Sequence, residues 1–183
     1  AEVASTCNEV LLTKYLLSVE TDKRRRAYIL NRFLEGFRTT VFRQTLFAEF
    51  EQKAHVLDAQ GTPITAECLN KVYEDLERMY YPDAEFRDEI KYEWAFIPHF
   101  YRAFYVYVYA TGLCAAVSLS ERILNEGEPA VRDYKKFLSA GSSVTPIEAL
   151  KLAGIDMSSP EPVRKAMEVF RETVQKMHEV TGV

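Results

Sequence analysis

A histidine and three tyrosines at alternate positions are the residues of this sequence best suited to chemistry. They lie in the stretch 97–119, which reads IPHFYRAFYVYVYATGLCAAVSL and contains His99, Tyr105, Tyr107 and Tyr109. Imidazole and phenol groups can donate hydrogen bonds to negative charge that develops in a reaction. Aromatic side chains are also ordinary core residues, so each tyrosine taken alone is more simply interpreted as packing.

Two carboxylates near the start of the chain are the second candidates. Glu2 and Glu9 are seven residues apart, so on a helix they lie two turns apart on one side. Each would be either a solvated residue at the edge of the apolar stripe or an inward-facing group held by a partner. Spacing alone favours the solvated interpretation.

Complete catalytic motifs are missing from the sequence. It contains no glycine-rich phosphate loop and no Gly-x-Ser-x-Gly turn. A His-Glu-x-x-His zinc motif is also missing, because His178-Glu179 is followed by Val180, Thr181 and Gly182. Residue types alone therefore indicate a helical domain with one face lined by a histidine and tyrosines.

The composition is that of a globular domain. The chain has 183 residues, 48% of them hydrophobic and 27% charged, which is enough for one sizeable core and argues against disorder. A net charge of −4 and a pI near 5.5 provide no basic surface for nucleic acid or an anionic membrane. Three scattered cysteines, Cys7, Cys68 and Cys114, and the lack of a visible signal peptide predict reduced thiols in a cytoplasmic protein.

One uncharged stretch is long enough to raise the question of a membrane span. Eighteen residues without charge separate Arg102 from Glu121. We interpret the stretch as a buried central helix, because three tyrosine hydroxyls suit hydrocarbon poorly and no second span accompanies it. A protein built on a membrane segment at 103–120 is therefore the weakest alternative, and no membrane partner is expected.

Helical periodicity without convincing strand alternation predicts an all-α fold. The chain starts without Met in the middle of a helical pattern, which suggests a piece of a longer protein. The expected helices cover about 1–18, a very long 22–57 capped at Thr21-Asp22, 66–80 capped at Thr65, a central helix from His99 to about Asn125, and shorter helices that begin near Pro129, Thr145-Pro146 and Ser159-Pro160.

Two features of the long second helix could carry function. The basic run Lys23–Arg26 lies in its first turn, where it would form an anion site or, as we favour, a solvated face paired with acids. His55 lies near the C-terminal end of this helix, where the helix dipole favours a positive charge, and it is expected on the surface.

Four separated blocks, in order, resemble one family. They are AEVASTCNE (1–9), FRQTLFAEFE (42–51), IPHFYRAFYVYVYATG (97–112) and ALKLAGIDMSSPEPV (149–163). The chain is similar, from its first residue to about 175, to oligoendopeptidase F of the thimet-oligopeptidase-like zinc metallopeptidases. The resemblance implies that residues 1–183 form a single all-helical domain, the C-terminal part of a zincin-type oligopeptidase catalytic domain whose long central cleft admits only unfolded peptides.

The resemblance assigns a zinc ligand to the start of the chain. The family's third ligand is a Glu in an Ala-Glu-x-Ala-Ser block, which stands here as Ala1-Glu2-Val3-Ala4-Ser5, so Glu2 is the expected ligand of Zn²⁺. Two histidines plus one carboxylate form a common catalytic zinc site. The histidine pair and the catalytic Glu would belong to the remaining N-terminal part of the enzyme, and Glu9 would orient a ligand.

The resemblance also implies roles in the tyrosine-rich stretch. His99 and a tyrosine would donate hydrogen bonds to the tetrahedral oxyanion. Related peptidases place that tyrosine about ten residues after the histidine, which selects Tyr109. Tyr105, one turn before Tyr109 on the same helix face, could bind the peptide backbone, and Tyr107 would pack elsewhere. Which of the three tyrosines faces substrate stays open.

The function implied is a zinc metalloendopeptidase that hydrolyses short oligopeptides. This chain would supply one ligand and the oxyanion donors, and alone it would be inactive because it lacks the His-Glu-x-x-His motif. The alternative is a non-catalytic helical module that binds peptides or serves a structural role. A His-Glu-x-x-His helix upstream of Glu2 would separate the two.

Overall fold

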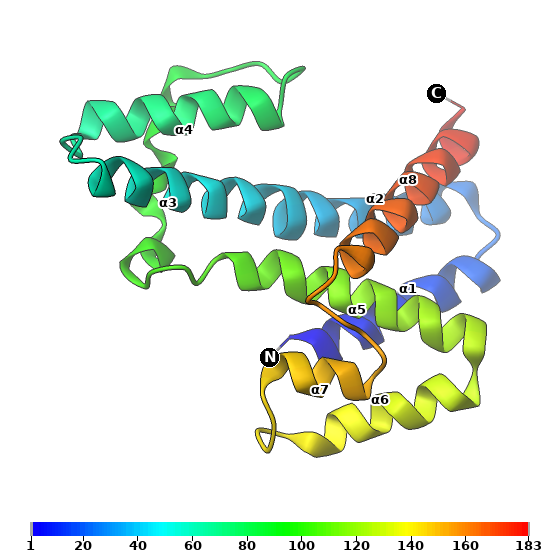
Figure 1. Ribbon diagram of the computed structural model, residues 1–183. Coiled ribbons are helices and arrows are strands. Elements are labelled where there is room, and N and C mark those ends of the chain that lie inside the picture. The colour runs from blue at the N-terminus through cyan, green and yellow to red at the C-terminus, as the bar shows by residue number, and fades with distance from the viewer. Residues whose placement is uncertain (1, 183) are drawn as a thin grey trace. The chain divides into compact units, whose positions relative to one another are not determined.

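All regular elements of the structure are helices, as Figure 1 shows. The structure is a computed structural model that describes residues 2–182, and in this range no strand occurs, so the predicted all-α fold is confirmed. The helices are α1 (Val3–Val19), α2 (Lys23–Phe37), η1 (Arg38–Phe42), α3 (Arg43–Ala59), α4 (Ala66–Tyr80), η2 (Asp88–Phe96), η3 (Pro98–Tyr101), α5 (Tyr107–Glu126), α6 (Glu128–Ala140), α7 (Pro146–Leu152) and α8 (Glu161–Thr181).

The chain divides into two compact units. The first comprises Ala1–Arg38 and Thr111–Val183, and the second comprises Thr39–Ala110. Both boundaries fall inside helical elements, at the start of η1 and within α5. The predictions of one 1–183 domain and of a long cleft stay predictions, and each unit is described below by itself.

The expected long helix forms, with one irregular turn. Asp22 caps its start, because its side chain accepts a hydrogen bond from the backbone N–H of Arg25 at 2.9 Å. α2 then continues through η1, a π-helix whose wider turn holds an extra residue, into α3. Arg26 of the basic run donates to the backbone oxygens of Leu17 and Glu20. Nη1 of Arg25 lies 3.6 Å from a carboxylate oxygen of Glu20, which is the pairing with acids expected for this run, whereas the contacts of Arg26 are to the backbone.

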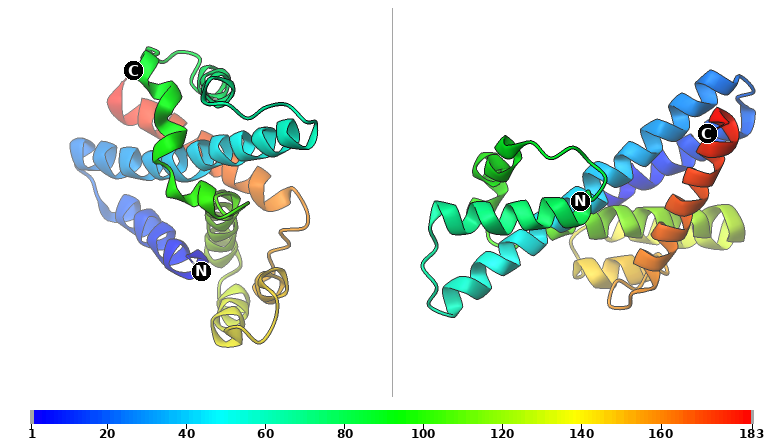
Figure 2. Two further views of the ribbon diagram at one scale, coloured as in Figure 1. Left: turned by 90° about the vertical axis from the view of Figure 1, so that its left-hand side faces the viewer. Right: turned by 90° about the horizontal axis from the view of Figure 1, so that it is seen from above.

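The core of the first unit fixes α1. Tyr134 of α6 donates its hydroxyl hydrogen bond at 3.1 Å to the backbone oxygen of Ala4, and Ser120 of α5 lies 3.2 Å from the backbone oxygen of Cys7. Elsewhere in the unit α8 packs against α2, as Figures 1 and 2 show. The ring centroids of Phe37 and Phe170 lie 5.3 Å apart between these two helices. The residues at the centre of this core are Cys7, Ala115, Ala116, Leu119, Tyr134, Ala153 and Ile155.

Aromatic packing holds the second unit together. α3 and α4 form a helical hairpin and lie side by side in Figures 1 and 2. The ring of Phe50 lies 5.3 Å from that of Tyr73 on α4, 6.1 Å from that of Trp94 on η2 and 5.2 Å from that of Phe100 on η3. The short helices that precede α5 are therefore packed onto the hairpin by aromatic side chains from three elements.

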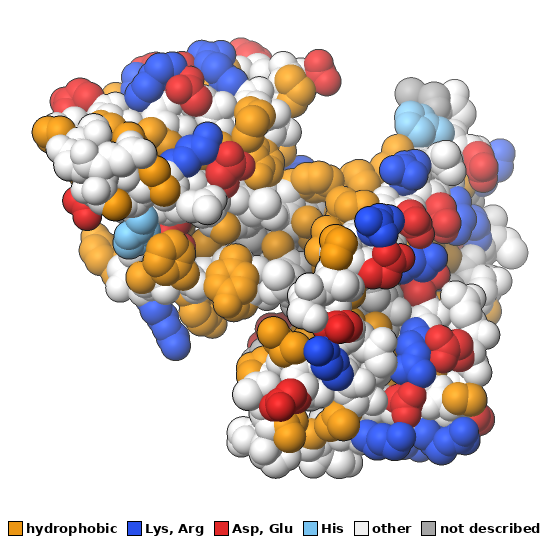
Figure 3. All heavy atoms as spheres, in the orientation of Figure 1, with side chains coloured by type: hydrophobic (Ala, Val, Ile, Leu, Met, Phe, Trp, Pro, Cys, Tyr) orange, Lys and Arg blue, Asp and Glu red, His pale blue; other side chains and the backbone are white. Residues whose placement is uncertain are grey.

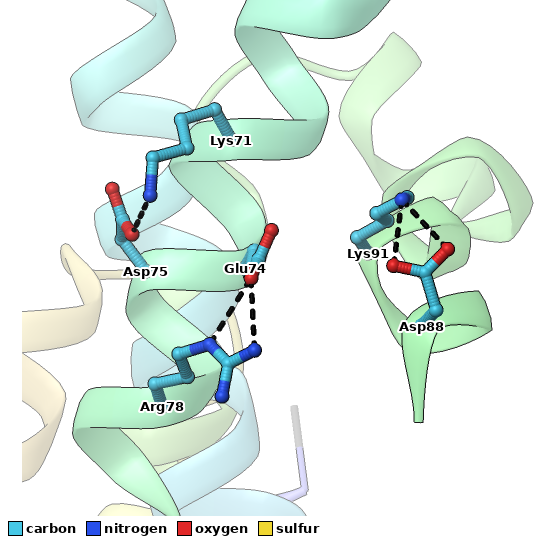
Figure 4. Close-up of polar contacts among 6 residues, drawn as sticks. All are labelled: Lys71, Glu74, Asp75, Arg78, Asp88 and Lys91. Atoms are coloured by element: carbon cyan, nitrogen blue, oxygen red, sulfur yellow. Dashed lines mark hydrogen bonds and ion pairs between the residues drawn. The ribbon is translucent and has the colours of Figure 1, made fainter. Parts of the chain in front are cut away.

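Ion pairs on the surface of this unit link residues close in sequence. Figure 4 shows Lys71 with Asp75 and Arg78 with Glu74 on α4, and Lys91 with Asp88 on η2. Exposed pairs of this kind each contribute roughly 1 kcal/mol or less. The aromatic core, not these pairs, accounts for most of the unit's stability.

The predicted start of the central helix at His99 is wrong. His99 lies in the 3₁₀ turn η3, and α5 begins only at Tyr107. The chain leaves η3 at Arg102, which is extended with φ −123° and ψ 90°, and Phe104 follows with a φ of 56°, in the left-handed region that does not continue a right-handed helix. The middle of α5 is buried as expected, over 114–120. Within residues 2–182 no helix is long and apolar enough to cross a membrane.

Candidate active site

His99 is positioned by a proline-led turn. Pro98 occupies the first position of η3, where its missing N–H leaves no hydrogen bond unmade. The backbone oxygen of His99 accepts a hydrogen bond from the N–H of Arg102 at 2.9 Å, which closes the turn. The imidazole is half-buried. Proline therefore starts a helical element here, although that element is the short turn η3 and not the expected central helix.

The segment between η3 and α5 is anchored by one buried residue. Val106 is 1% exposed and packs in the aromatic core of the second unit. Tyr105 and Tyr109 are half-buried, whereas Tyr107 is 51% exposed. Tyr105 precedes the first residue of α5, so the expectation that it shares a helix face with Tyr109 fails as a statement about helix geometry.

The structure nevertheless brings three of the predicted residues together. Nε2 of His99 lies 3.0 Å from the hydroxyl of Tyr109. The ring of Tyr105 stacks on that of His99, with centroids 5.8 Å apart and planes 18° apart, and meets the ring of Tyr109 edge-on at 5.6 Å. We call His99, Tyr105 and Tyr109 the ring group.

The polar pair of the ring group can bind an anionic oxygen. When Nε2–H of His99 donates to the Tyr109 oxygen, the phenol proton can serve a second acceptor. When the phenol donates to Nε2 instead, the imidazole carries its proton on Nδ1. A charged oxygen is the stronger acceptor and competes for these protons. The arrangement suits hydrogen-bond donation to a developing oxyanion.

The segment that carries the ring group exposes several apolar side chains. Figure 3 shows hydrophobic side chains gathered where Figure 1 places the segment before α5. Phe96 is 80% and Tyr101 is 92% exposed. The other large apolar residues exposed in this segment are Tyr92, Phe104, Tyr107 and Val108. A surface of this kind offers contacts to side chains of a bound peptide.

The two acidic candidates both lie on α1 or at its start. Glu2 immediately precedes α1, is exposed, and its Oε2 accepts a hydrogen bond from the Ser5 hydroxyl at 3.0 Å. Glu9 is also exposed. Ala1, the first residue of the block that selects Glu2, lies outside the described residues. Ser5 thus orients the carboxylate that the resemblance assigns to zinc.

A metal site is not complete within the described residues. No group of three His, Cys, Asp or Glu side chains in the range 2–182 could hold a metal ion. A catalytic zinc takes three protein ligands. The exposed and oriented carboxylate of Glu2 fits the part of one such ligand, and further ligands would come from outside this chain.

Sequence reasoning missed one buried carboxylate that bears on the ring group. Glu51 of α3 is 5% exposed, and its Oε1 accepts a hydrogen bond from the N–H of Phe104 at 2.7 Å. The signal was present in FAEFE, because Glu51 follows Phe47 by four residues and so lies on the apolar stripe of α3. A charge on such a stripe needs a buried partner.

The chain matches one family model over most of its length. The model described as "Peptidase family M3" matches residues 1–169. Oligopeptidase PepF of Bacillus subtilis (strain 168) is 55% identical over 181 residues, which are 98% of this chain and 27% of that protein. The oligoendopeptidase F homolog of Lactococcus lactis subsp. lactis (strain IL1403) is 44% identical over 181 residues, 98% of this chain and 30% of that protein.

Solved structures match as well. Oligoendopeptidase-F from Enterococcus faecium has a TM-score of 0.95 and 46% sequence identity, over 99% of this chain and 35% of that one. A putative peptidase from Chlamydophila abortus has a TM-score of 0.91 and 41% identity, over 98% of this chain and 30% of that one. The chain thus spans only about a third or less of the length of these relatives.

Proposed function

This chain belongs to peptidase family M3, and from that premise we propose that the complete protein is a zinc-dependent oligoendopeptidase that hydrolyses short, unfolded peptides. The names of its relatives, oligopeptidase and oligoendopeptidase, support the substrate class. The observation that carries the proposal is the 3.0 Å contact between Nε2 of His99 and the hydroxyl of Tyr109. Two adjacent donors are the groups that a peptidase needs for a tetrahedral oxyanion.

The ring group would accelerate the reaction by electrostatic stabilisation of the transition state. Attack on a peptide carbonyl turns its oxygen into an oxyanion, and hydrogen bonds that strengthen at that moment lower the barrier. His99 and Tyr109 donate these bonds. Tyr105 keeps the imidazole in place through its stacked ring, and its hydroxyl binds the peptide backbone. Each donor is worth about 10²–10³ in rate.

Glu2 is the proposed protein ligand of the zinc from this chain. Its carboxylate is exposed and is held by Ser5 through the hydrogen bond to Oε2. Bound zinc supplies Lewis acidity toward the scissile carbonyl. Glu9, on α1, orients a ligand of the site. The histidine ligands and the general base come from the N-terminal part of the enzyme, so the isolated 183 residues are inactive. A cytoplasmic location fits the three cysteines, all free thiols.

The test is steady-state kinetics of the complete protein on internally quenched fluorescent peptides. His99→Gln and Tyr109→Phe should each lower kcat by about 10²–10³ and leave KM within about threefold. Tyr107→Phe, which removes the hydroxyl of a residue that is 51% exposed and two positions from Tyr109, is the matched comparison and should be near wild type. Wild-type kcat in both donor variants would refute the donor roles.

The rival function is a non-catalytic module that binds or scaffolds peptides. It predicts that the complete protein binds peptides without cleaving them and that chelation of metal changes nothing. Absence of hydrolysis by the complete wild-type protein, with peptide binding retained, would establish this rival in place of the peptidase.

A further inference from the structure

Phe104 stands in a conformation that its surroundings must enforce. In the described part of the chain it is the one non-glycine residue with a positive φ, 56°. This conformation is strained for an L-residue because its Cβ approaches the backbone too closely. An aromatic side chain has no polar group that could offset the strain with a local hydrogen bond. The contacts of Phe104 with the rest of the unit therefore decide whether the conformation persists.

Two successive turns of α3 hold Phe104. Glu51 accepts the hydrogen bond of the Phe104 N–H at 2.7 Å. His55, one helical turn later, stacks its ring on that of Phe104, with centroids 4.6 Å apart. One contact holds the backbone and the other holds the side chain.

The cost of burying Glu51 indicates that its hydrogen bond matters. The residue is 5% exposed, and a buried carboxylate is unfavourable unless hydrogen bonds satisfy it. A bond from a backbone N–H to an ionised oxygen is stronger than a neutral one. If Phe104 left its conformation, Glu51 would lose this partner inside the aromatic core. The hydrogen bond therefore stabilises both the buried carboxyl group of Glu51 and the left-handed backbone conformation of Phe104.

Phe104 lies where the chain turns from His99 toward Tyr105 and Tyr109. Between η3 and α5 only residues 102–106 connect the imidazole to the two phenols. Val106 fixes one end of this connection in the aromatic core. The φ of Phe104 sets the direction in which Tyr105 leaves, and so decides whether the Tyr105 ring meets that of His99.

We propose that Glu51 is a positioning residue of the active site, which holds Phe104 in its left-handed conformation and thereby keeps His99 against Tyr109. This inference rests on the proposed role of the ring group. Glu51 is not proposed to touch substrate or metal. It acts through the backbone of Phe104, and it does so as a hydrogen-bond acceptor.

The experiment combines kinetics and hydrogen exchange on the complete protein. Glu51→Ala should lower kcat by about 10- to 100-fold, because displacement of catalytic groups by about 1 Å has effects of that size, and should leave KM within about threefold. Glu51→Gln keeps an oxygen acceptor and should retain most of kcat. Amide exchange in peptides that span 97–106 should be faster in Glu51→Ala than in wild type and unchanged in Glu51→Gln.

A neighbouring carboxylate provides the matched control. Glu49, two residues earlier on α3, accepts a hydrogen bond from the Tyr80 hydroxyl at 3.0 Å and contacts α4. Glu49→Gln should change neither kcat nor exchange at 97–106. If Glu51→Ala does not fold by circular dichroism, Glu51→Asn replaces it, since its shorter amide falls one methylene short of Phe104.

Three results would overturn the inference. Wild-type kcat in the Glu51 variants that remove the acceptor would show that the ring group does not depend on this residue. Equal losses in Glu51→Gln and Glu51→Ala would show that charge acts, not the acceptor. In a Phe104→Gly background, where a positive φ is not strained, Glu51→Ala should lower kcat by a smaller factor than it does in the wild-type background. An equal loss of kcat in the two backgrounds would contradict the mechanism.

The parallel Tyr109→Phe variant separates this inference from the proposed function. Unchanged kcat in Tyr109→Phe would refute the role of the ring group itself. Loss of kcat in Tyr109→Phe together with full activity in Glu51→Ala would refute only the positioning role of Glu51.

Discussion

The ring of Tyr105 lies face to face with the imidazole of His99, with planes 18° apart, whereas Tyr109 approaches that imidazole with its hydroxyl. The guanidinium of Arg102 lies 4.6 Å from the Tyr105 ring centroid and adds a cation–π contact. The two tyrosines therefore contact one histidine by different means. At 105 the aromatic ring makes the contact, and at 109 the oxygen does.

Removing the two hydroxyls should consequently have unequal effects. We expect Tyr105→Phe to retain kcat within about threefold and to raise KM if its hydroxyl binds the peptide backbone, while Tyr105→Leu loses the stacked ring and lowers kcat about tenfold or more. Tyr109→Phe lowers kcat by about 10²–10³. Steady-state kinetics on one peptide decide the matter, and a kcat loss in Tyr105→Phe equal to that in Tyr109→Phe would exchange their roles.

Glu2→Gln should weaken metal binding by the complete protein. An amide is a much poorer zinc ligand than a carboxylate, so we expect about one zinc per wild-type chain and a greatly reduced content in the variant. Glu9→Gln should weaken affinity by a smaller factor, about 10- to 100-fold. Elemental analysis after dialysis gives the stoichiometry, with Glu172→Gln, an exposed glutamate of α8, as the control.

Two other outcomes of the metal measurement have clear meanings. Unchanged zinc in Glu2→Gln would place the third ligand elsewhere. No zinc in the wild type would favour the non-catalytic module.

Gly154→Ala should destabilise the first unit more than a positive φ alone explains. A Cβ at Gly154 would overlap the guanidinium of Arg122, which is held there by its hydrogen bonds to Ala153 and Asp133. We expect a loss of roughly 2–4 kcal/mol, since strain, steric overlap and broken bonds add. Gly61→Ala is the control, because Gly61 has the same φ of 76° with open space around it.

Chemical or thermal denaturation measures the difference between these two glycines. Gly61→Ala should cost about 1–2 kcal/mol, the strain alone. Equal losses at both positions would mean that Arg122 moves aside without penalty.

Stability should depend on pH through Glu77 of α4. Desolvation, and then repulsion from Glu93, raises the pKa of Glu77 above its ordinary value near 4.5. The folded protein thus binds this proton more tightly than the unfolded chain does, so the contribution of Glu77 becomes unfavourable as pH rises through the raised pKa.

Glu77→Gln should therefore stabilise the protein at neutral pH and give no gain well below pH 4.5. The gain at pH 7 should be about 1 kcal/mol or less, because the side chain is only half-buried. Melting temperatures across pH report it. Glu74→Gln, which removes the exposed ion pair with Arg78, is the control and should show no gain at any pH.

The cysteines should differ in reactivity. Burial raises the pKa of Cys114 to about 11 and also raises the pKa of Cys7, whereas Cys68 is only half-buried. Iodoacetamide at about pH 8 should therefore label Cys68 first, and Cys7 and Cys114 only after unfolding, because the thiolate is the reactive form. Mass mapping of labelled sites checks this order. Early labelling of Cys114 would indicate that the buried residues 114–120 of α5 become exposed without unfolding of the whole protein.

The N-terminal caps of the helices were predictable from the sequence because a cap depends on residues within one helical turn. Thr65 caps α4 by accepting a hydrogen bond from Cys68 N–H, and Thr145 and Glu148 form a reciprocal capping box on α7. Both starts follow from residue type and spacing alone. The all-α class was predictable from helical periodicity, whereas the prediction that Glu2 and Glu9 share one helix is wrong for Glu2, which immediately precedes α1.

The start of the central helix was not predictable in this way. IPHFYRAFYVYVYATG contains no glycine or proline between His99 and Tyr109, and the strand-like alternation YVYVY at 105–109 is outweighed by the helix formers that follow it. In the structure the chain leaves the helix at Arg102, and the left-handed Phe104 contacts Glu51 and His55, about fifty residues earlier in the chain. A tertiary contact of this range overrides local propensity.

The sequence by itself determined that this protein is helical, where most helices begin, and which residue types could serve a peptidase. Only the tertiary structure decided that His99, Tyr105 and Tyr109 meet. A helix from His99 would separate the histidine from Tyr109 by nearly three turns, or roughly 15 Å along the axis. Their contact at 3.0 Å requires the chain to leave the helix between them, which it does at the extended Arg102 and the left-handed Phe104, whose N–H donates to the buried Glu51.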